Sequence, residues 1–361
     1  MAEKFNQGPK VFIQRLQSVG KLPEDILLLT SSKASYQKFL SQSDKKYTIT
    51  RLDGVSYYKA SFTNVSFFLK QRYHKMHFIL RFLLAFLISL IGDRNFNKIL
   101  DRFTLRLMAN SDAIIFQSKL SLAMHEKFLG FNSKNSNFTI ILNGVDTSSF
   151  YPIKKQIHTD APQVIISASL YRPHKRLQDA ILLINHLSDQ YPRIQLHILG
   201  ELDPLVSMLL EDMDLSRCIF HGTVDVDQLP KYYSSCDIQL SLSLFDPCPN
   251  VVCEGLACGL PVISPLQSGA SEILGDKLLA CCIDESVSLN YSSYHTPGQV
   301  PVINLIDYSR VFTQIYDNIL YYSHLARKRA VSNLDIKYIH SLYINFMSNL
   351  DEKSLNIDGD I

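Results

Sequence analysis

The feature that most constrains the fold is a regular alternation of two apolar patterns between residues 164 and 264. Short apolar runs of strand length alternate with segments whose apolar residues recur at helical spacing. This alternation predicts an α/β fold in which a doubly wound parallel sheet is covered by helices on both faces. The expected strands are 164–169, 194–199, 218–221, 238–243 and 261–264, and the expected helices are 176–187, 204–211, 228–235 and 250–258.

The N-terminal residues repeat this alternation less regularly. A chain of 361 residues is too long for one compact core, so two domains are expected, at 1–152 and 153–335. Residues 336–361 should form a C-terminal helix and a tail, and a crossing of that helix back to the N-terminal domain is one option. Only seven residues, most of them polar, precede the turn residue Gly8. The strand that usually opens such a domain is therefore expected to be missing or short.

Charge and cysteine content exclude several classes of protein. The net charge of +2 gives no support for nucleic acid as a partner. The seven cysteines are odd in number, and several lie in expected strands or helices, which indicates reduced thiols in a cytoplasmic protein. Cys248, Cys253 and Cys258 recur every five residues, unlike zinc ligands, so no metal is expected. The polar N-terminus has no signal-peptide core.

One stretch carries a distinctive chemistry. An apolar strand is followed by Asp246, a tight turn with Pro247 and Pro249, and a short helix that contains Glu254. The N-terminus of a helix favours anions such as phosphates, because its backbone N–H groups point outward. Carboxylates accept hydrogen bonds from pairs of sugar hydroxyls. The stretch therefore suits a nucleotide-sugar, although Asp246 also fits a turn residue ahead of proline.

Several motifs together resemble the family-4 retaining glycosyltransferases, which have the GT-B fold of two Rossmann-like domains facing across a cleft. The resemblance is strong between about residues 110 and 275 and weaker outside them. The motifs occur in the order of the family: Gly8-Pro9, Asn143-Gly144-Val145-Asp146, Lys175, Leu199-Gly200-Glu201, His221-Gly222 and the block from Asp246 to Glu272.

The resemblance implies roles for individual residues. Asp246 and Glu254 have the spacing of the family's paired glutamates, with Asp in the first place, and would contact the donor sugar and the ribose. Lys175 matches the second of two cations on the donor diphosphate. The expected Arg is absent at positions 169 and 170, and Arg172 is the candidate to replace it. These four form the catalytic set, and the donor-binding candidates are Cys248, Pro249, Asn250, Val251, Gly8 and Gly200.

The implied activity is metal-independent transfer of a sugar from a nucleotide-diphosphate-sugar to a saccharide or lipid-linked acceptor, in cell-surface polysaccharide or lipopolysaccharide synthesis. No cofactor is expected beyond this co-substrate. Retention in this family does not rely on a protein nucleophile, so groups that position the acceptor are sought. Arg51 and Asp53, at the end of the strand expected at 47–51, are the acceptor-binding candidates. Asp53 fits a turn aspartate before glycine equally well.

Residues 65–106 have an unusual composition. The run 82–88 is nearly all apolar, and Lys70, Lys75, Lys98 and Arg102 are among the basic residues that flank it. Such a segment suits a helix on an anionic membrane surface, which would make the protein peripheral on the inner face of the membrane. The same pattern suits a buried core helix with a solvated face. The sequence does not choose between these two interpretations.

The sequence also bears on three other functions. A dehydrogenase is excluded because the sequence contains no Gly-x-Gly. A metal-dependent glycosyltransferase would use an Asp-x-Asp site, which 212–214 and 225–227 match literally, but such short matches arise by chance. The main alternative is a non-catalytic GT-B protein that acts as a membrane-associated partner. The missing Arg and the Asp at position 246 keep this alternative open.

Overall fold

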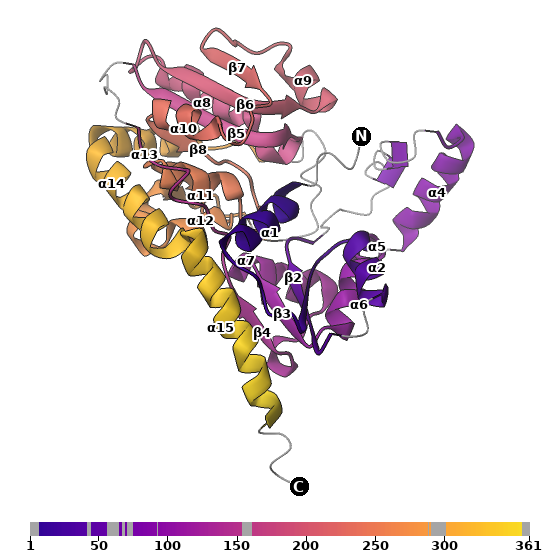
Figure 1. Cartoon of the computed structure of the whole chain (residues 1–361). Coiled ribbons are helices and arrows are strands. Elements are labelled where there is room, and N and C mark those ends of the chain that lie inside the picture. The colour runs from indigo at the N-terminus through magenta and orange to yellow at the C-terminus, as the bar shows by residue number, and fades with distance from the viewer. Residues whose placement is uncertain are drawn as a thin grey trace.

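The computed structural model describes two parallel sheets with helices packed around them (Figure 1). The residues described are 7–41, 45–55, 65–66, 69–70, 75–91, 93–153, 161–287, 289 and 301–355. Both sheets belong to the α/β class expected from the strand–helix alternation. Among the described residues, no helix is both long and apolar enough to cross a membrane.

The N-terminal domain has a four-stranded sheet with the order β1-β2-β3-β4, and every neighbouring pair is parallel. The strands are short, and most of their residues are apolar or β-branched, which favours the extended conformation. Its strands are β1 (Ile26–Thr30), β2 (Tyr47–Leu52), β3 (Ala113–Phe116) and β4 (Phe138–Ile140). Its helices are α1 (Gln7–Val19), α2 (Lys33–Ser41), α4 (Phe78–Leu90), α5 (Asp93–Leu100), α6 (Arg102–Asn110) and α7 (Lys119–Met124), with the π-helical turn His125–Leu129 and the 3-10 turn Ser133–Asn135.

The first described element of this domain is a helix, not the strand that usually opens such a domain. Helix α1 begins at Gln7, so Gly8 lies in a helix rather than in a turn between a strand and a helix. Residues 1–6 lie outside the described residues. Within the described part, the first strand is therefore β1, which follows α1.

The C-terminal domain has a six-stranded parallel sheet with the order β10-β9-β8-β5-β6-β7. The helices alternate with the strands along the chain, as the sequence predicts. Its strands are β5 (Gln163–Tyr171), β6 (Gln195–Leu202), β7 (Cys218–Gly222), β8 (Ile238–Leu240), β9 (Val262–Pro265) and β10 (Cys282–Ile283). Its helices are α8 (Leu177–Leu187), α9 (Pro204–Leu210), α10 (Leu229–Ser235), α11 (Asn250–Ala257) and α12 (Ala270–Leu274), with the 3-10 turns Pro173–Lys175 and Asp276–Cys281.

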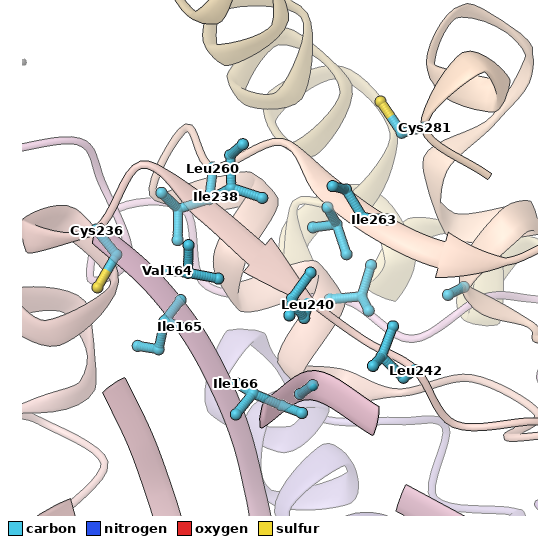
Figure 2. Packing of buried hydrophobic residues seen from close by; sticks show 14 of the residues in the cluster. Val164, Ile165, Ile166, Cys236, Ile238, Leu240, Leu242, Leu260, Ile263 and Cys281 are labelled. Atoms are coloured by element: carbon cyan, nitrogen blue, oxygen red, sulfur yellow. The ribbon is translucent and has the colours of Figure 1, made fainter. Parts of the chain in front are cut away.

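The core of the C-terminal domain lies around strands β5, β8 and β9 (Figure 2). Val164, Ile166, Ile238, Leu240 and Ile263 are at most 3% exposed, because these strands are covered by helices on both faces. Each such side chain contributes about 2 kcal/mol by leaving water. All seven cysteines are free thiols, and most are buried among these apolar side chains.

The last part of the chain corrects one expectation. The sequence of residues 307–327 predicts a single helix, but the structure has α13 (Leu305–Asp317) and α14 (Ile319–Arg329), separated at Asn318. Asn318 leaves the helical conformation with φ −119° and ψ 30°, and its side-chain amide donates to the carbonyl oxygen of Gln314. A polar side chain that competes for backbone groups favours such a break. The π-helical turn Ala330–Leu334 follows α14.

Helix α15 (Ile336–Leu355) runs from the C-terminal domain along the N-terminal one (Figure 1). Its side chains Ile339 and Tyr343 are buried in one cluster with Phe12 and Leu16 of α1. The crossing is secured at Val145, whose N–H donates to Leu334 O at 2.9 Å and whose carbonyl accepts from Ile336 N at 2.9 Å. The end of the chain therefore completes the core of the domain that begins it.

Candidate functional site

The strand order of the C-terminal sheet indicates where a ligand binds. From β5 the chain adds β6 and β7 on one side, and it adds β8, β9 and β10 on the other. Loops that follow β5 and β8 therefore leave the sheet in opposite directions and open a crevice at the carboxyl ends of these strands. The segment with Arg172 and Lys175 follows β5, and the segment with Asp246 follows β8. Both sequence-predicted charged groups thus reach the same crevice.

Lys175 and Asp246 are in direct contact. Lys175 Nζ donates to Asp246 Oδ2 at 2.6 Å, although 71 positions separate them in the sequence. Their side chains are 25% and 19% exposed, so the pair lies at the surface of the crevice and is open to a ligand. An ammonium beside a carboxylate presents a cation for phosphate and an acceptor for hydroxyls within a few ångströms.

The turn around Asp246 is tightly held. Phe245 has φ 52°, a left-handed conformation that a bulky residue rarely adopts. Gly269 N donates to Asp246 O at 2.8 Å, and a Cβ at Gly269 would lie 1.8 Å from Pro247 O. Only glycine can pack this closely against the turn. A strained backbone held in place by its surroundings is typical of functional sites, where it fixes a side chain in position.

Glu254 lies inside the crevice, on α11. It is 5% exposed, and its carboxylate accepts from Tyr233 Oη at 3.2 Å and from Arg15 Nη2 at 2.6 Å. Ser167, near the end of β5, contacts Tyr233 Oη at 2.7 Å. The carboxylate that the resemblance assigns to the donor ribose is therefore held from both domains.

Arg15 is the functional-site residue that the sequence did not reveal. It lies on α1 of the N-terminal domain and packs over the ring of Phe150, 5.5 Å from its centroid. Burial disfavours its charge, but the Glu254 carboxylate outweighs this effect and holds the pKa of Arg15 above its ordinary value. Nη1 of Arg15 is buried and has no hydrogen-bond partner among the described residues. No local pattern predicts a pair of residues that lie 239 positions apart.

The two acceptor-binding candidates occupy different environments. Arg51 is 0% exposed, and its guanidinium is hydrogen-bonded to Asp53, Gln117 and Asn143. An acceptor therefore cannot touch Arg51 without displacing these partners, so Arg51 is a positioning residue in this structure. Asp53 is 18% exposed at the side chain. Burial raises the pKa of Asp53, despite the attraction of Arg51.

The loop that carries Asp53 contacts the turn that carries Asp246. The next residue, Gly54, packs against Pro247, and a Cβ at Gly54 would lie 3.2 Å from Pro247 Cγ. Ser121 Oγ donates to the backbone carbonyl of Asp53 at 2.7 Å and so fixes the loop. Asp53 and Asp246 are therefore carried on two loops that touch at Pro247, which is where an acceptor and a donor would have to meet.

Asn143 links the two loops through its side chain. Its Nδ2 donates to Cys248 O at 2.9 Å and to Asn250 Oδ1 at 2.8 Å, and its Oδ1 accepts from Arg51. Its backbone N–H is 3.3 Å from Cys248 Sγ. This residue opens the Asn143-Gly144-Val145-Asp146 motif. The structure thus gives that motif a physical role, which is to join the N-terminal domain to the turn before α11.

The remaining donor-binding candidates divide into two groups. Cys248, Pro249, Asn250 and Val251 form the N-terminus of α11, beside Asp246. Gly8 lies in the first turn of α1 and Gly200 lies in β6. Gly200 has φ 127°, and a Cβ there would lie 1.8 Å from Ala168 O, so it allows β6 to pack closely against β5.

Arg172 and its neighbour Arg176 serve different purposes. Arg172 is exposed and has no side-chain partner among the described residues. Arg176 is 0% exposed, with φ 58°, and pairs with Asp179 and Glu285 at 2.8 Å. These carboxylates hold the pKa of Arg176 above its ordinary value, although burial opposes the charge. Arg176 therefore secures the base of the loop, while Arg172 and Lys175 extend from it.

No group of three or more His, Cys, Asp or Glu side chains in the described part of the chain could hold a metal ion. The two literal Asp-x-Asp matches lie outside the crevice, where Asp212 and Asp225 are exposed.

Comparisons with known proteins agree with this geometry. Residues 151–288 match the family described as glycosyl transferases group 1. These residues include β5 to β10 and the pair Lys175 and Asp246. No curated protein matches the sequence closely enough to count as a relative.

Solved structures show the same fold at low sequence identity. Sucrose-phosphate synthase from Thermosynechococcus elongatus is 17% identical with a TM-score of 0.55, over 97% of this chain and 80% of that one. TarM from S. aureus, solved with UDP, is 15% identical with a TM-score of 0.57, over 94% and 58%. HepE from Anabaena, solved with UDP, is 14% identical with a TM-score of 0.55, over 90% and 99%.

Proposed function

We propose that this chain, a GT-B glycosyltransferase with a group 1 domain over residues 151–288, transfers a sugar with retention to a saccharide or lipid-linked acceptor. The donor is a nucleoside diphosphate sugar. The observation that carries the proposal is the contact of Lys175 with Asp246 at the carboxyl ends of β5 and β8, with Glu254 on the helix that follows. TarM and HepE, which share the fold, were solved with UDP.

The donor would bind with its diphosphate at the N-terminus of α11 and beside Lys175. Backbone N–H groups at a helix N-terminus stabilise phosphate without any metal. Arg172 is exposed on the same loop as Lys175 and can add a second positive charge. These cations stabilise the charge that develops on the leaving diphosphate. Asp246 accepts hydrogen bonds from the donor sugar, and Glu254 accepts them from the ribose.

Transfer then needs one bond to form and one to break on the same face of the sugar. The acceptor oxygen bonds to the anomeric carbon, and the bond from that carbon to the diphosphate oxygen breaks with its electron pair going to the diphosphate. The proton of the acceptor hydroxyl goes to a donor phosphate oxygen. Asp53 is placed to orient this hydroxyl, since its loop touches Pro247 beside Asp246.

We further propose that the protein works in the cytoplasm, at the inner face of a membrane, in the synthesis of cell-surface polysaccharide or lipopolysaccharide. Supporting this, α4 exposes large apolar side chains, with Phe82 51% and Leu87 58% exposed. Arg102 and Arg106 follow α4 in the sequence, are exposed on α6 and can attract anionic lipids. A lipid-linked acceptor would be met at such a surface.

The test is a thermal-shift screen of the protein against UDP-, GDP- and ADP-sugars, with EDTA present throughout. At least one donor should raise the melting temperature and should be turned over, and NMR of the product should show the anomeric configuration of the donor. A donor that stabilises the protein only after metal is added would contradict metal independence. An inverted product would contradict the same-face mechanism.

A second candidate function is a non-catalytic GT-B partner protein. It is favoured by the contact of Arg15 with Glu254, which occupies the expected ribose site in the described structure, and by Leu170 at the position of the family's Arg. This candidate predicts that no nucleotide-sugar stabilises the protein. Wild-type turnover of any donor excludes it.

A further inference from the structure

Helix α4 exposes an apolar surface unlike any other described part of the molecule. It is 13 residues long and projects from the N-terminal domain (Figure 1). Elsewhere, large exposed apolar side chains occur singly or in small groups, as is normal for a protein surface. On α4 the residues exposed by 50% or more are Phe78, Ile79, Leu80, Phe82, Leu83, Phe86, Leu87 and Leu90.

The other side of α4 attaches the helix to the domain. Ala85 is buried in a small cluster with Val65, Leu69 and Phe96, and Leu84, Ile88 and Ile91 pack against it partly buried. Apart from Arg81, this inner face is also apolar, so α4 lacks a broad polar face. It is therefore unlike an amphipathic helix that lies flat on a membrane, which keeps one face polar.

The exposed residues occupy a wide arc with no charge. At about 100° per residue, the residues from Phe78 to Leu90 that are exposed cover an arc of about 200°. The one charged residue, Arg81, falls outside this arc and is half-buried. Ser89 lies within the arc and is half-buried, and its hydroxyl donates to Phe86 O at 2.7 Å, so its donor is satisfied inside the helix. Nothing in the arc requires water.

The width of the arc argues against a protein partner. A helix that packs on a protein buries an apolar stripe roughly 100° wide. A second copy of α4 would therefore leave about half of this arc in water. A lipid leaflet surrounds the helix and covers the whole arc.

Basic residues before and after α4 in the sequence favour an anionic leaflet. Lys70, Lys75, Arg102 and Arg106 are exposed, and Lys98 is half-buried. All five flank α4 in the sequence, and their ammonium and guanidinium groups suit lipid phosphates. The only acidic side chain described in this region is Asp101, so the local charge is positive.

We propose that α4 inserts its exposed arc into the hydrocarbon of a single leaflet, with the basic residues at the level of the headgroups. This inference rests on the membrane association proposed above and specifies its mode. The helix is about 20 Å long, which is shorter than the hydrocarbon core of about 30 Å. It therefore anchors in one leaflet and does not span the bilayer. Apolar burial supplies the affinity, and the basic residues adjust it to anionic lipid.

The sequence offers a direct test because it contains no tryptophan. Phe82→Trp and Phe86→Trp each place a single fluorophore on the exposed arc. Tyr321→Trp is the matched control, since Tyr321 is 62% exposed on α14, away from α4. The full chain is mixed with vesicles of phosphatidylcholine and phosphatidylglycerol that carry either acyl-chain bromines or headgroup nitroxides.

Acyl-chain bromines should quench both α4 reporters more strongly than headgroup nitroxides do, and should leave Tyr321→Trp unchanged. Replacing Phe82, Phe86 and Leu87 with Ser should lower vesicle partitioning by at least about tenfold, with the melting temperature and donor turnover in vesicle-free buffer retained. Changing Lys98, Arg102 and Arg106 to Gln should mainly weaken the dependence on phosphatidylglycerol.

Three outcomes would overturn the proposal, and they differ in what else they affect. Quenching by headgroup nitroxides alone, with intact co-sedimentation, would retain membrane association and reject insertion. Absence of co-sedimentation would reject both. A dimer in solution that the Ser variant converts to monomer would show that a second copy covers α4. None of these results bears on donor turnover, which is measured separately.

Discussion

In the C-terminal sheet the strand order reverses between β5 and β8, whereas in the N-terminal sheet β1 to β4 follow one another without a reversal. Ligands of doubly wound sheets bind at such a reversal, and the candidate donor-binding pair Lys175 and Asp246 lies there. The described N-terminal sheet has no such reversal of its own. It contributes to the site through side chains that reach across, namely Arg15, Asp53 and Asn143.

The hydrophobic cores of the two domains also differ, because one is continuous and the other is divided. The C-terminal domain has one continuous core cluster, built around β5, β8 and β9. The buried residues of the N-terminal domain fall into several smaller clusters, and the largest of them needs Ile339 and Tyr343 of α15. The C-terminal domain therefore has a hydrophobic core of its own, whereas the core of the N-terminal domain depends on α15 at the end of the chain.

The largest expected effect concerns the candidate site in the C-terminal domain. Asp246→Ala removes the acceptor for the donor sugar and the partner of Lys175, so kcat/KM should fall by about 10³ while the fold is kept. The matched control is Asp225→Asn, at an exposed Asp-x-Asp match, which should leave turnover unchanged. Steady-state kinetics with the best donor measures both. Near-normal turnover of Asp246→Ala would remove the assignment, and a large loss in the control would favour a metal-dependent site.

The next effect concerns the dependence of the N-terminal domain on α15. Ile339 is 1% exposed, so Ile339→Ala should cost about 3.5 kcal/mol through lost burial and a residual cavity. The loss should appear as an earlier N-terminal transition in calorimetry, with the C-terminal transition in place. Tyr338→Ala, at a position 44% exposed, is the control and should change little. Equal shifts of both transitions would mean that the domains unfold as one unit.

The ion pair across the cleft should couple the domains. Arg15→Ala leaves the buried Glu254 carboxylate without its cation and should cost about 3 kcal/mol of stability. Arg15→Lys keeps the charge and should recover part of this loss. A double-mutant cycle with Glu254→Gln, followed by urea denaturation, measures the coupling between the two side chains. Strictly additive effects would show that the contact contributes nothing.

The smallest effect is a dependence on pH within the N-terminal domain. Burial lowers the pKa of His125 to about 4, and its ring Nδ1 donates to Ser121 O at 2.7 Å. The unfolded chain therefore takes up this proton near pH 6.5, before the folded chain does. Stability is present above pH 6.5 and falls by about 1.5 kcal/mol between pH 6.5 and 5.

Denaturation at several pH values checks this expectation. His125→Asn keeps a donor for Ser121 O but cannot titrate, so it should reduce the slope of unfolding free energy against pH. His186→Asn, at an exposed histidine on α8, is the control and should leave the slope unchanged. An unchanged slope in His125→Asn would contradict the assignment.

The sequence predicted the C-terminal domain closely, because each of its elements has a local cause. Its strands are mainly apolar, and its short helices are bounded by residues such as Pro204 and Gly259. The resemblance singled out Lys175 and Asp246, and the structure brings them together because the ends of parallel strands meet at one edge of the sheet. The helix expected at 307–327 was wrong in one respect, because Asn318 divides it.

The roles of Arg51 and Arg15 could not be predicted in the same way. Arg51 was expected to face an acceptor. In the structure its side chain packs against Phe12, whose ring centroid lies 4.3 Å from the guanidinium carbon of Arg51. The two interpretations of residues 65–106 stayed open because the same apolar run suits both a buried core helix and a helix on a membrane surface. The structure places α4 at the surface, with most of its large side chains exposed.

By itself the sequence determined the α/β class, the order of the C-terminal elements and the turn that carries Asp246 and Glu254. These depend on hydrophobic period and on Pro and Gly, which act over a few residues. Only the tertiary structure decided that Arg15 meets Glu254, that Asn143 joins the two loops and that α15 completes the N-terminal core. The physical reason is that these contacts join residues more than 100 positions apart, and they exist only once the two domains have packed together.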